Sequence, residues 1–176
     1  MTPRTQGYTL AAAIFVIDQL VKWIMTGPLA LREVGQIVLL PIFNFTYTEN
    51  TGVSLGLLSA TSDTQRWLLV ALTAGIATGV AVWMTRETNR WDIVALAMIL
   101  GGALGNIVDR ARFGYVVDFL DLHFGEFRPF MIFNVADAAI TAGVVLLLAR
   151  SWLLRDKPAK PAPNSAGDQP ASETLH

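Results

Sequence analysis

The stretch WDIVALAMILGGALGNIVDR, residues 91–110, decides the fold because it is apolar for most of its length and polar at its end. Its middle, residues 93–105, contains only apolar side chains and glycines, as in a membrane-spanning helix. Asn106 is three positions before Asp109 and four before Arg110, so a helix presents all three on one face. Polar groups in a span usually face the interior of a bundle and mark a functional site. The stretch therefore predicts a membrane helix with a polar face at one end.

Four stretches are long and apolar enough to cross a bilayer, at residues 8–26, 67–84, 91–108 and 130–154. The first is interrupted by Asp18, Gln19 and Lys22 and lacks a small-x-small cleavage site, so we expect a retained helix rather than a signal peptide. The fold class predicted is an all-α membrane protein with four transmembrane helices, a small extracytoplasmic sheet or cradle, and an outer loop.

The composition narrows the possible functions. Of the 176 residues, 53% are hydrophobic and 15% are charged, against about 25% charged in soluble proteins. The net charge of -1 points neither to nucleic acid nor to an acidic ligand. The absence of cysteine excludes disulfides, thiol catalysis, iron–sulfur clusters and cysteine zinc sites.

The distribution of Lys and Arg predicts the orientation. Seven lie on the side of both termini and the turn TRETNR, and five lie on the opposite side. Since basic residues favour the cytoplasm, both termini are expected there, with outer loops 27–66 and 109–129 on the other side. We expect residues 1–155 to form one domain. Residues 156–176, rich in Pro, Ala and Ser, are expected to form a disordered cytoplasmic tail.

Both outer loops contain strand-like sequence. In FNFTYTEN, residues 43–50, aromatic and polar side chains alternate, which predicts a half-buried strand. YVVDFLDLHF, residues 115–124, has a weaker pattern of the same kind. A small sheet on the outer face is therefore expected.

Two aspartates stand in unusually apolar surroundings. Asp118 is flanked by Tyr115, Val117 and Phe119, and Asp137 is expected about two turns inside the fourth span, too deep for an end-cap. Two carboxylates close together in a poorly solvated site do not both ionise, so one acts as a base and the other as an acid. A water between them can then attack an amide carbonyl. Sequence spacing alone does not show that the two meet.

The roles of several other side-chain pairs are not decided by the sequence. Asp18 and Lys22 are four apart, which fits either a structural ion pair near the outer end or a substrate contact. Asn134 shares a helix face with Asp137. Gly101 and Gly105, also four apart, would let another helix approach closely.

Three other functions fit parts of the sequence. Gly52 to Gly56 matches the G-x-S-x-G of serine hydrolases, with Ser54 as nucleophile, but the only histidines are His123 and His176. Asp118, Asp121 and His123 form a possible metal-ligand set. A small oligomeric transporter would also use intramembrane Asp, Arg and Asn residues.

Taken together, the motifs resemble those of the lipoprotein signal peptidases, also called signal peptidase II, over residues 18–140. Five motifs occur in the family's order. They are D-Q-x-x-K at residues 18–22, N-x-G at 50–52, G-G-x-x-G-N-x-x-D-R at 101–110, G-x-V-x-D-F at 114–119 and F-N-x-A-D at 133–137. Where the family often has an aromatic residue followed by Ser, this chain has Leu55 and Gly56.

The resemblance implies a bacterial inner-membrane aspartic endopeptidase with its site near the outer face. Such enzymes remove the signal peptide from diacylglyceryl-modified prolipoproteins, cutting before the lipidated cysteine. The implied partners are these substrates, membrane lipids and the inhibitor globomycin; a monomer is expected, without metal, cofactor or nucleic acid. The resemblance places the catalytic pair on Asp118 and Asp137, and supporting residues on Asn106, Arg110 and Asn134. It gives structural or substrate-contact roles to Asp18, Lys22, Asn50, Gly52 and Asp109.

Overall fold

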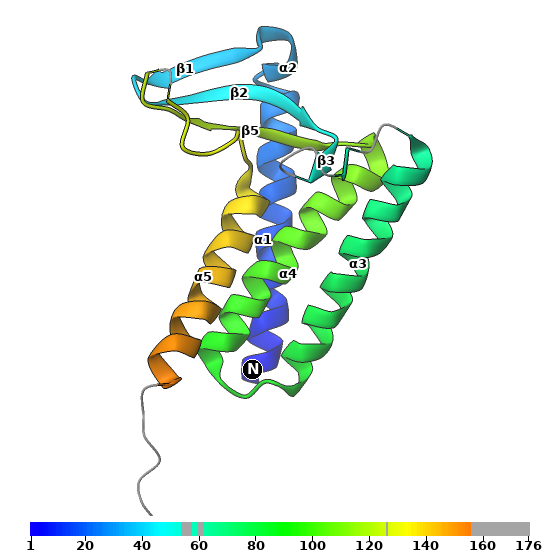
Figure 1. Cartoon of the computed structure of the whole chain (residues 1–176), viewed down its shortest axis with the longest axis vertical. Coiled ribbons are helices and arrows are strands. Elements are labelled where there is room, and N and C mark those ends of the chain that lie inside the picture. Colours follow the sequence, from blue (N-terminus) through cyan, green and yellow to red (C-terminus); the bar gives the residue numbers. More distant parts are fainter. Residues whose placement is uncertain (54–57, 60–61, 126, 156–176) are drawn as a thin grey trace, which may run out of the picture.

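Four long helices form the body of the molecule in the computed structural model, which describes residues 1–53, 58–59, 62–125 and 127–155. They are α1 (Pro3–Thr26), α3 (Asp63–Arg86), α4 (Arg90–Phe113) and α5 (Val135–Arg155). Each contains a segment long and apolar enough to cross a membrane. Helix α4 packs against α1, α3 and α5 and is therefore the centre of the bundle (Figure 1). The prediction of four membrane helices is confirmed.

The helix ends differ from the predicted spans where capping groups decide them. Ser62 caps α3 through a reciprocal pair of hydrogen bonds with Gln65, so the helix starts before residue 67. Helix α4 continues to Phe113 and ends at Gly114, which has a φ of 89°. Residues 109–113 are thus the last turn of a helix. The first connection, 27–62, is shorter than the predicted loop 27–66, and the second, 114–134, is displaced by five residues from the predicted loop 109–129.

Glycines on α4 allow the helices to approach closely, as predicted. A Cβ on Gly101 would lie 2.5 Å from the carbonyl oxygen of Ala11 on α1. A Cβ on Gly105 would collide with the carboxylate of Asp18, also on α1. Larger residues at these positions would therefore push α1 away from α4.

A small antiparallel sheet covers one end of the bundle (Figure 1). Its strand order is β1 (Gln36–Leu40), β2 (Phe43–Asn50) and β5 (Val116–Leu122). The two short strands β3 (Gly52–Val53) and β4 (Leu58–Ser59) pair separately, and a single helical turn, α2 (Leu31–Val34), precedes β1. The predicted small sheet is confirmed, and β2 has the bounds expected from its alternating sequence.

The sheet packs onto the end of the bundle through a small apolar cluster. Val117 and Phe119 of β5 are buried against Met25 at the end of α1 and Leu31 of α2. Since these side chains are at most 6% exposed, their burial fixes the height of β5 above the helices. Everything that β5 carries is therefore held close to the ends of α1, α4 and α5.

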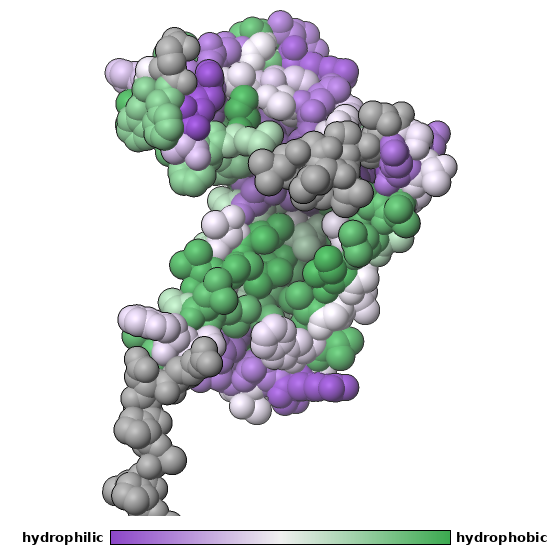
Figure 2. Space-filling model, viewed as in Figure 1, coloured by the Kyte–Doolittle hydropathy of each residue, from purple (hydrophilic) through white to green (hydrophobic). Residues whose placement is uncertain are grey.

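The outer surface of the bundle is apolar, as expected for helices in lipid. On the face drawn in Figure 2, hydrophobic residues cover the middle of the helices, with hydrophilic residues at the end opposite the sheet. One end of the sheet is apolar too: Val38 and Leu40 of β1 are exposed, as are Phe127, Phe130 and Met131 in the connection to α5.

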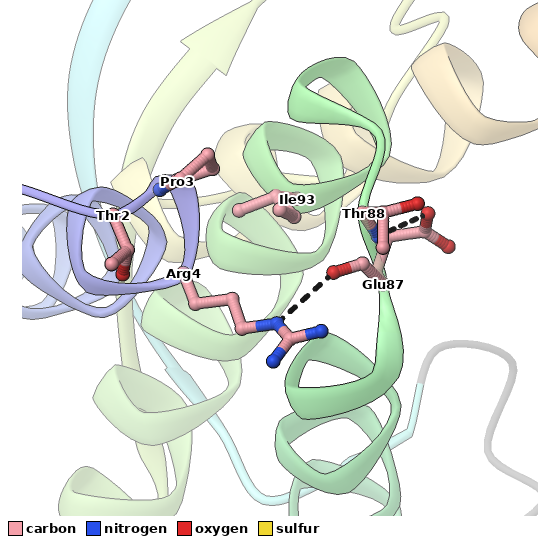
Figure 3. Close-up of a pocket in the computed structure, with 6 residues that line it drawn as sticks. All are labelled: Thr2, Pro3, Arg4, Glu87, Thr88 and Ile93. Carbon is pink, nitrogen blue, oxygen red and sulfur yellow. Dashed lines mark hydrogen bonds between the residues drawn. The ribbon is translucent and has the colours of Figure 1, made fainter.

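A cavity of about 300 Å³ lies at the opposite end of the bundle, between the start of α1 and the α3–α4 turn (Figure 3). Arg4 Nε donates to the carbonyl oxygen of Glu87 at 3.2 Å beside it, which ties the two segments together. None of the predicted site residues lines this cavity; its lining consists of Thr2, Pro3, Arg4, Glu87, Thr88 and Ile93.

Candidate active site

The predicted site residues come together beneath the sheet, where α1, α4, β5 and the start of α5 meet. A short backbone bridge makes this possible: Leu120 N donates to the carbonyl oxygen of Phe133 at 2.8 Å, and Phe133 N donates to that of Leu120 at 3.1 Å. The bridge places the end of the connection before α5 against β5. It therefore brings Asn134 and Asp137 to Asp118.

Asp137 lies in the first turn of α5, which corrects the prediction of a position two turns inside a helix. Asp137 N donates to Asn134 Oδ1 at 2.8 Å, and Asn134 N donates to Asp137 Oδ2 at 3.4 Å. This reciprocal pair resembles a capping box and starts the helix at Val135. The apolar run 130–133 concealed the helix start, because hydropathy does not distinguish an apolar connection from a span. The second carboxylate oxygen of Asp137 accepts from Asn106 Nδ2 at 2.7 Å.

Asp118 lies in the middle of β5 and is only 1% exposed. Its Oδ1 accepts from Asn134 Nδ2 at 2.6 Å and its Oδ2 from Asn50 Nδ2 at 3.0 Å. Burial and then the negative charge of Asp137 raise the pKa of Asp118 to about 7, against the lowering effect of the two amide donors and of Lys22. Close to neutral pH this carboxyl group is therefore ready both to hold and to release a proton.

Asn134 joins the two aspartates directly. Its side chain donates to Asp118 and accepts from the backbone N–H of Asp137, while its own backbone N–H donates to Asp137. Asn134 is fully buried, and its Nδ2 also donates to Asn106 Oδ1 at 3.2 Å. The structure therefore brings Asp118 and Asp137 together, and their negative charges affect one another.

A turn after β2 closes one side of the pair. Asn50 donates to Asp118 and accepts from Gly52 N at 3.1 Å, which is an Asx-type turn. Arg110 Nη2 donates to the carbonyl oxygen of Gly52 at 3.2 Å. Arg110 Nε is buried and has no hydrogen-bond partner among the described residues. Arg110 therefore offers a spare donor close to the two carboxylates.

A charged cluster lies on the α1 side of the pair. Lys22 Nζ is 2.8 Å from Asp18 Oδ2 and 2.7 Å from Asp109 Oδ2, and it donates to Asn106 Oδ1 at 3.3 Å. All three charged side chains are at most 5% exposed. The Asp18–Lys22 ion pair, one of the two predicted alternatives, is thus present, and Lys22 points into the protein rather than toward the membrane surface.

Two residues of this region were missed by the sequence reasoning. Gln19 Nε2 donates to Asp109 Oδ1 at 2.9 Å and to Asp18 Oδ2 at 3.2 Å, so it belongs to the charged cluster. Its position in D-Q-x-x-K was the available signal. Arg66 Nε donates to the carbonyl oxygen of Arg110 at 2.8 Å, and its Nη2 to that of Ala111 at 2.6 Å, which caps the end of α4. No local pattern around Arg66 indicated this contact.

The structure gives less support to the alternative metal and serine sites. Asp121 accepts from Thr46 and Arg128, and His123 contacts Asn44, so neither shares a partner with Asp118. The described part of the chain contains no group of three His, Cys, Asp or Glu side chains able to hold a metal ion. Ser54, Leu55 and Gly56 lie outside the described residues.

Comparisons with known proteins agree with one another. A family model described as signal peptidase (SPase) II matches residues 10–153. A lipoprotein signal peptidase of Sphingopyxis alaskensis is 61% identical over 151 residues, which cover 86% of this chain and 87% of that protein. One from Rhizorhabdus wittichii is 53% identical over 92% of this chain and 93% of its own length. A solved bacterial membrane enzyme matches with a TM-score of 0.72 at 26% identity, over 96% of this chain and 95% of its own.

Proposed function

The chain belongs to the signal peptidase II family, and on that premise we propose that it is an aspartic endopeptidase in which Asp118 and Asp137 perform the cleavage. It is a multi-pass membrane signal peptidase. Membership of this family argues against the transporter alternative. Its proposed substrates are diacylglyceryl-modified prolipoproteins, cut before the lipidated cysteine. The observation that carries the catalytic assignment is the link through Asn134, which hydrogen-bonds to both aspartates.

The paired carboxylates supply an acid and a base at one pH. Because the pKa of Asp118 is raised to about 7 by burial and by the charge of Asp137, the pair holds a single proton near neutrality. The ionised carboxylate takes a proton from a water molecule, whose oxygen attacks the carbonyl carbon of the scissile amide. The protonated carboxyl gives its proton to the carbonyl oxygen, which forms a neutral tetrahedral diol. Transfer of a proton to the amide nitrogen then breaks the C–N bond.

The surrounding amides keep the two carboxylates in place during these transfers. Asn134 and Asn50 donate to Asp118, and Asn106 donates to Asp137. Each amide is itself fixed by a further hydrogen bond, so the donors require little reorganisation as charge moves. The spare donor of Arg110 is suited to bind a carbonyl oxygen of the substrate peptide.

The position of the pair suits a lipid-anchored peptide. Asp137 lies at the first turn of α5, at the end of a membrane-spanning segment, and Asp118 lies in the strand directly above it. The acyl chains of the substrate can stay between lipids beside the apolar faces of the helices while the peptide bond reaches the carboxylates. With the termini in the cytoplasm, as the basic residues suggest, the sheet and the active site lie at the outer face.

The test is the separate replacement of each aspartate by its isosteric amide. Asp118→Asn and Asp137→Asn should abolish cleavage of a lipidated precursor in detergent while the protein remains folded. Asp121→Asn is a matched control, because Asp121 lies in the same strand and is also 1% exposed. It should keep its activity. Full activity of Asp118→Asn or Asp137→Asn would remove that residue from the mechanism.

A further inference from the structure

We propose that Lys22 is a positioning residue of the cleavage reaction: its buried ammonium group fixes the orientation of the Asn106 amide, and through it the two catalytic carboxylates. This inference deepens the proposed function and rests on Asp118 and Asp137 being the catalytic pair. Lys22 hydrogen-bonds to neither of them. Its influence passes through one asparagine side chain.

The contacts of Lys22 leave it no role as a substrate ligand. An ammonium group has three N–H donors, and three acceptors surround this one: Asp18 at 2.8 Å, Asp109 at 2.7 Å and Asn106 at 3.3 Å. The residue is 5% exposed. A lysine engaged in this way acts on its neighbours inside the protein rather than on a peptide outside it.

Asn106 is the point where the influence of Lys22 reaches the pair. Its Oδ1 faces two donors, Lys22 Nζ and Asn134 Nδ2, at 3.3 and 3.2 Å. Its Nδ2 donates to Asp137 at 2.7 Å. If this amide were rotated by half a turn, its NH2 group would face the Lys22 ammonium, which cannot accept a hydrogen bond. Its carbonyl oxygen would face the carboxylate of Asp137, which cannot donate one when ionised. Lys22 therefore specifies the orientation in which Asn106 supports Asp137.

The same orientation extends to the other carboxylate. Because Asn106 Oδ1 accepts from Asn134, the Asn134 amide keeps its NH2 group on the side of Asp118, to which it donates at 2.6 Å. Asp18 adds a second connection: its Oδ1 accepts from Ala136 N at 2.9 Å, at the first turn of α5. Asp18, which forms an ion pair with Lys22, therefore also binds the first turn of the helix that carries Asp137.

Lys22 also sets the charge balance around the pair. The charged groups that interact with it come from four elements: Asp18 on α1, Asp109 on α4, Asp118 on β5 and Asp137 on α5. Its ammonium lowers the pKa of Asp118, in opposition to burial. Without this positive charge the pair binds each of its protons more tightly. Both limbs of the pH profile of cleavage should therefore move to higher pH together.

The experiment compares kcat, KM and the pH profile of precursor cleavage in four variants of the full chain. Lys22→Met should lower kcat on the order of 100-fold through misplacement of the carboxylates, with little change in KM, and should move both pH limbs upward. Lys22→Arg, which keeps the charge, should leave the limbs in place. Arg150→Met breaks a half-buried ion pair with Asp92 at the other end of the bundle. It should lower the unfolding temperature without moving the limbs.

The fourth variant separates orientation from charge and guards against misfolding. Lys22→Met with Asp109→Asn removes one positive and one negative charge, so the cluster keeps its net charge. Its limbs should stay near those of the wild type while kcat remains low, because Asn106 has lost its donor. Wild-type kcat in this double variant, or unmoved limbs in a folded Lys22→Met protein, would overturn the positioning role. Should one of these two results be obtained, the aspartate variants show which proposal fails. If Asp118→Asn and Asp137→Asn are also active, the proposed catalytic pair is wrong; if both are inactive, the catalytic pair stands and only the role of Lys22 is wrong.

Discussion

Asn134 is the residue whose loss should affect folding and catalysis together, and Asn134→Ala tests this. The variant removes the N-cap of α5 and the donor to Asp118. Loss of an N-cap costs about 1 kcal/mol, and loss of a hydrogen bond to a charged group costs about 1.5–3 kcal/mol. Since the two contacts share one side chain, we expect the free energy of unfolding to fall by about 2–4 kcal/mol.

The catalytic effect follows from the same contact. The Asn134 donor lowers the pKa of Asp118, so its removal raises that pKa above about 7. The base form is then reached only at higher pH, and the acid limb of the cleavage profile moves upward. Asn134→Ser is the matched control, because a serine oxygen can still cap α5 but cannot replace the amide donor. It should recover about 1 kcal/mol of the lost stability and little of the lost activity.

The assays are denaturant unfolding in detergent, followed by tryptophan fluorescence, and cleavage of a lipidated precursor over a range of pH. If Asn134→Ala unfolds like the wild type, the reciprocal capping seen between Asn134 and Asp137 contributes nothing to the stability of α5. If its acid limb does not move, the hydrogen bond to Asp118 does not control protonation. Equal activity of Asn134→Ser and the wild type would refute the argument that the amide donor is required.

Four further outcomes are expected. Gly105→Ala should lower both stability and activity, because its Cβ collides with Asp18; thermal unfolding and precursor cleavage measure the two. Arg66→Met removes a hydrogen bond from each of two α4 carbonyl groups and should lower the free energy of unfolding by about 1–3 kcal/mol. Ser54→Ala should remain active, and its inactivity would revive the serine hydrolase alternative. Cleavage should persist in EDTA, so loss of activity that added metal restores would contradict a mechanism based on the carboxylates alone.

The site was only partly predictable. Residues 101–110 presented Asn106, Asp109 and Arg110 on one helix face, yet the three side chains reach three different elements. Asn106 donates to Asp137, Asp109 pairs with Lys22, and Arg110 donates to the carbonyl oxygen of Gly52. Helix periodicity fixes the angle at which a side chain leaves the axis. It does not say which neighbouring element receives that side chain.

The start of α5 shows the same limit. The apolar residues 130–133 favoured a helix by hydropathy, and Asp137 was therefore expected deep inside it. In the structure Phe133 pairs with Leu120 of β5, and Asn134 caps the helix, so Asp137 is in the first turn. Hydropathy measures only how apolar a segment is. A connection that packs against a sheet can be as apolar as a membrane helix, so hydropathy does not distinguish the two.

The sequence by itself determined the four membrane helices and the alternating strand β2, because apolar length and side-chain periodicity are properties of neighbours along the chain. It also determined the family through five short motifs in order. Only the tertiary structure decided that Asp118 and Asp137 meet through Asn134, and that Lys22 contacts them through Asn106. Those contacts join residues up to 84 positions apart. They exist because the packing of β5 on the bundle and of α1 on α4 brings these distant residues within hydrogen-bonding distance.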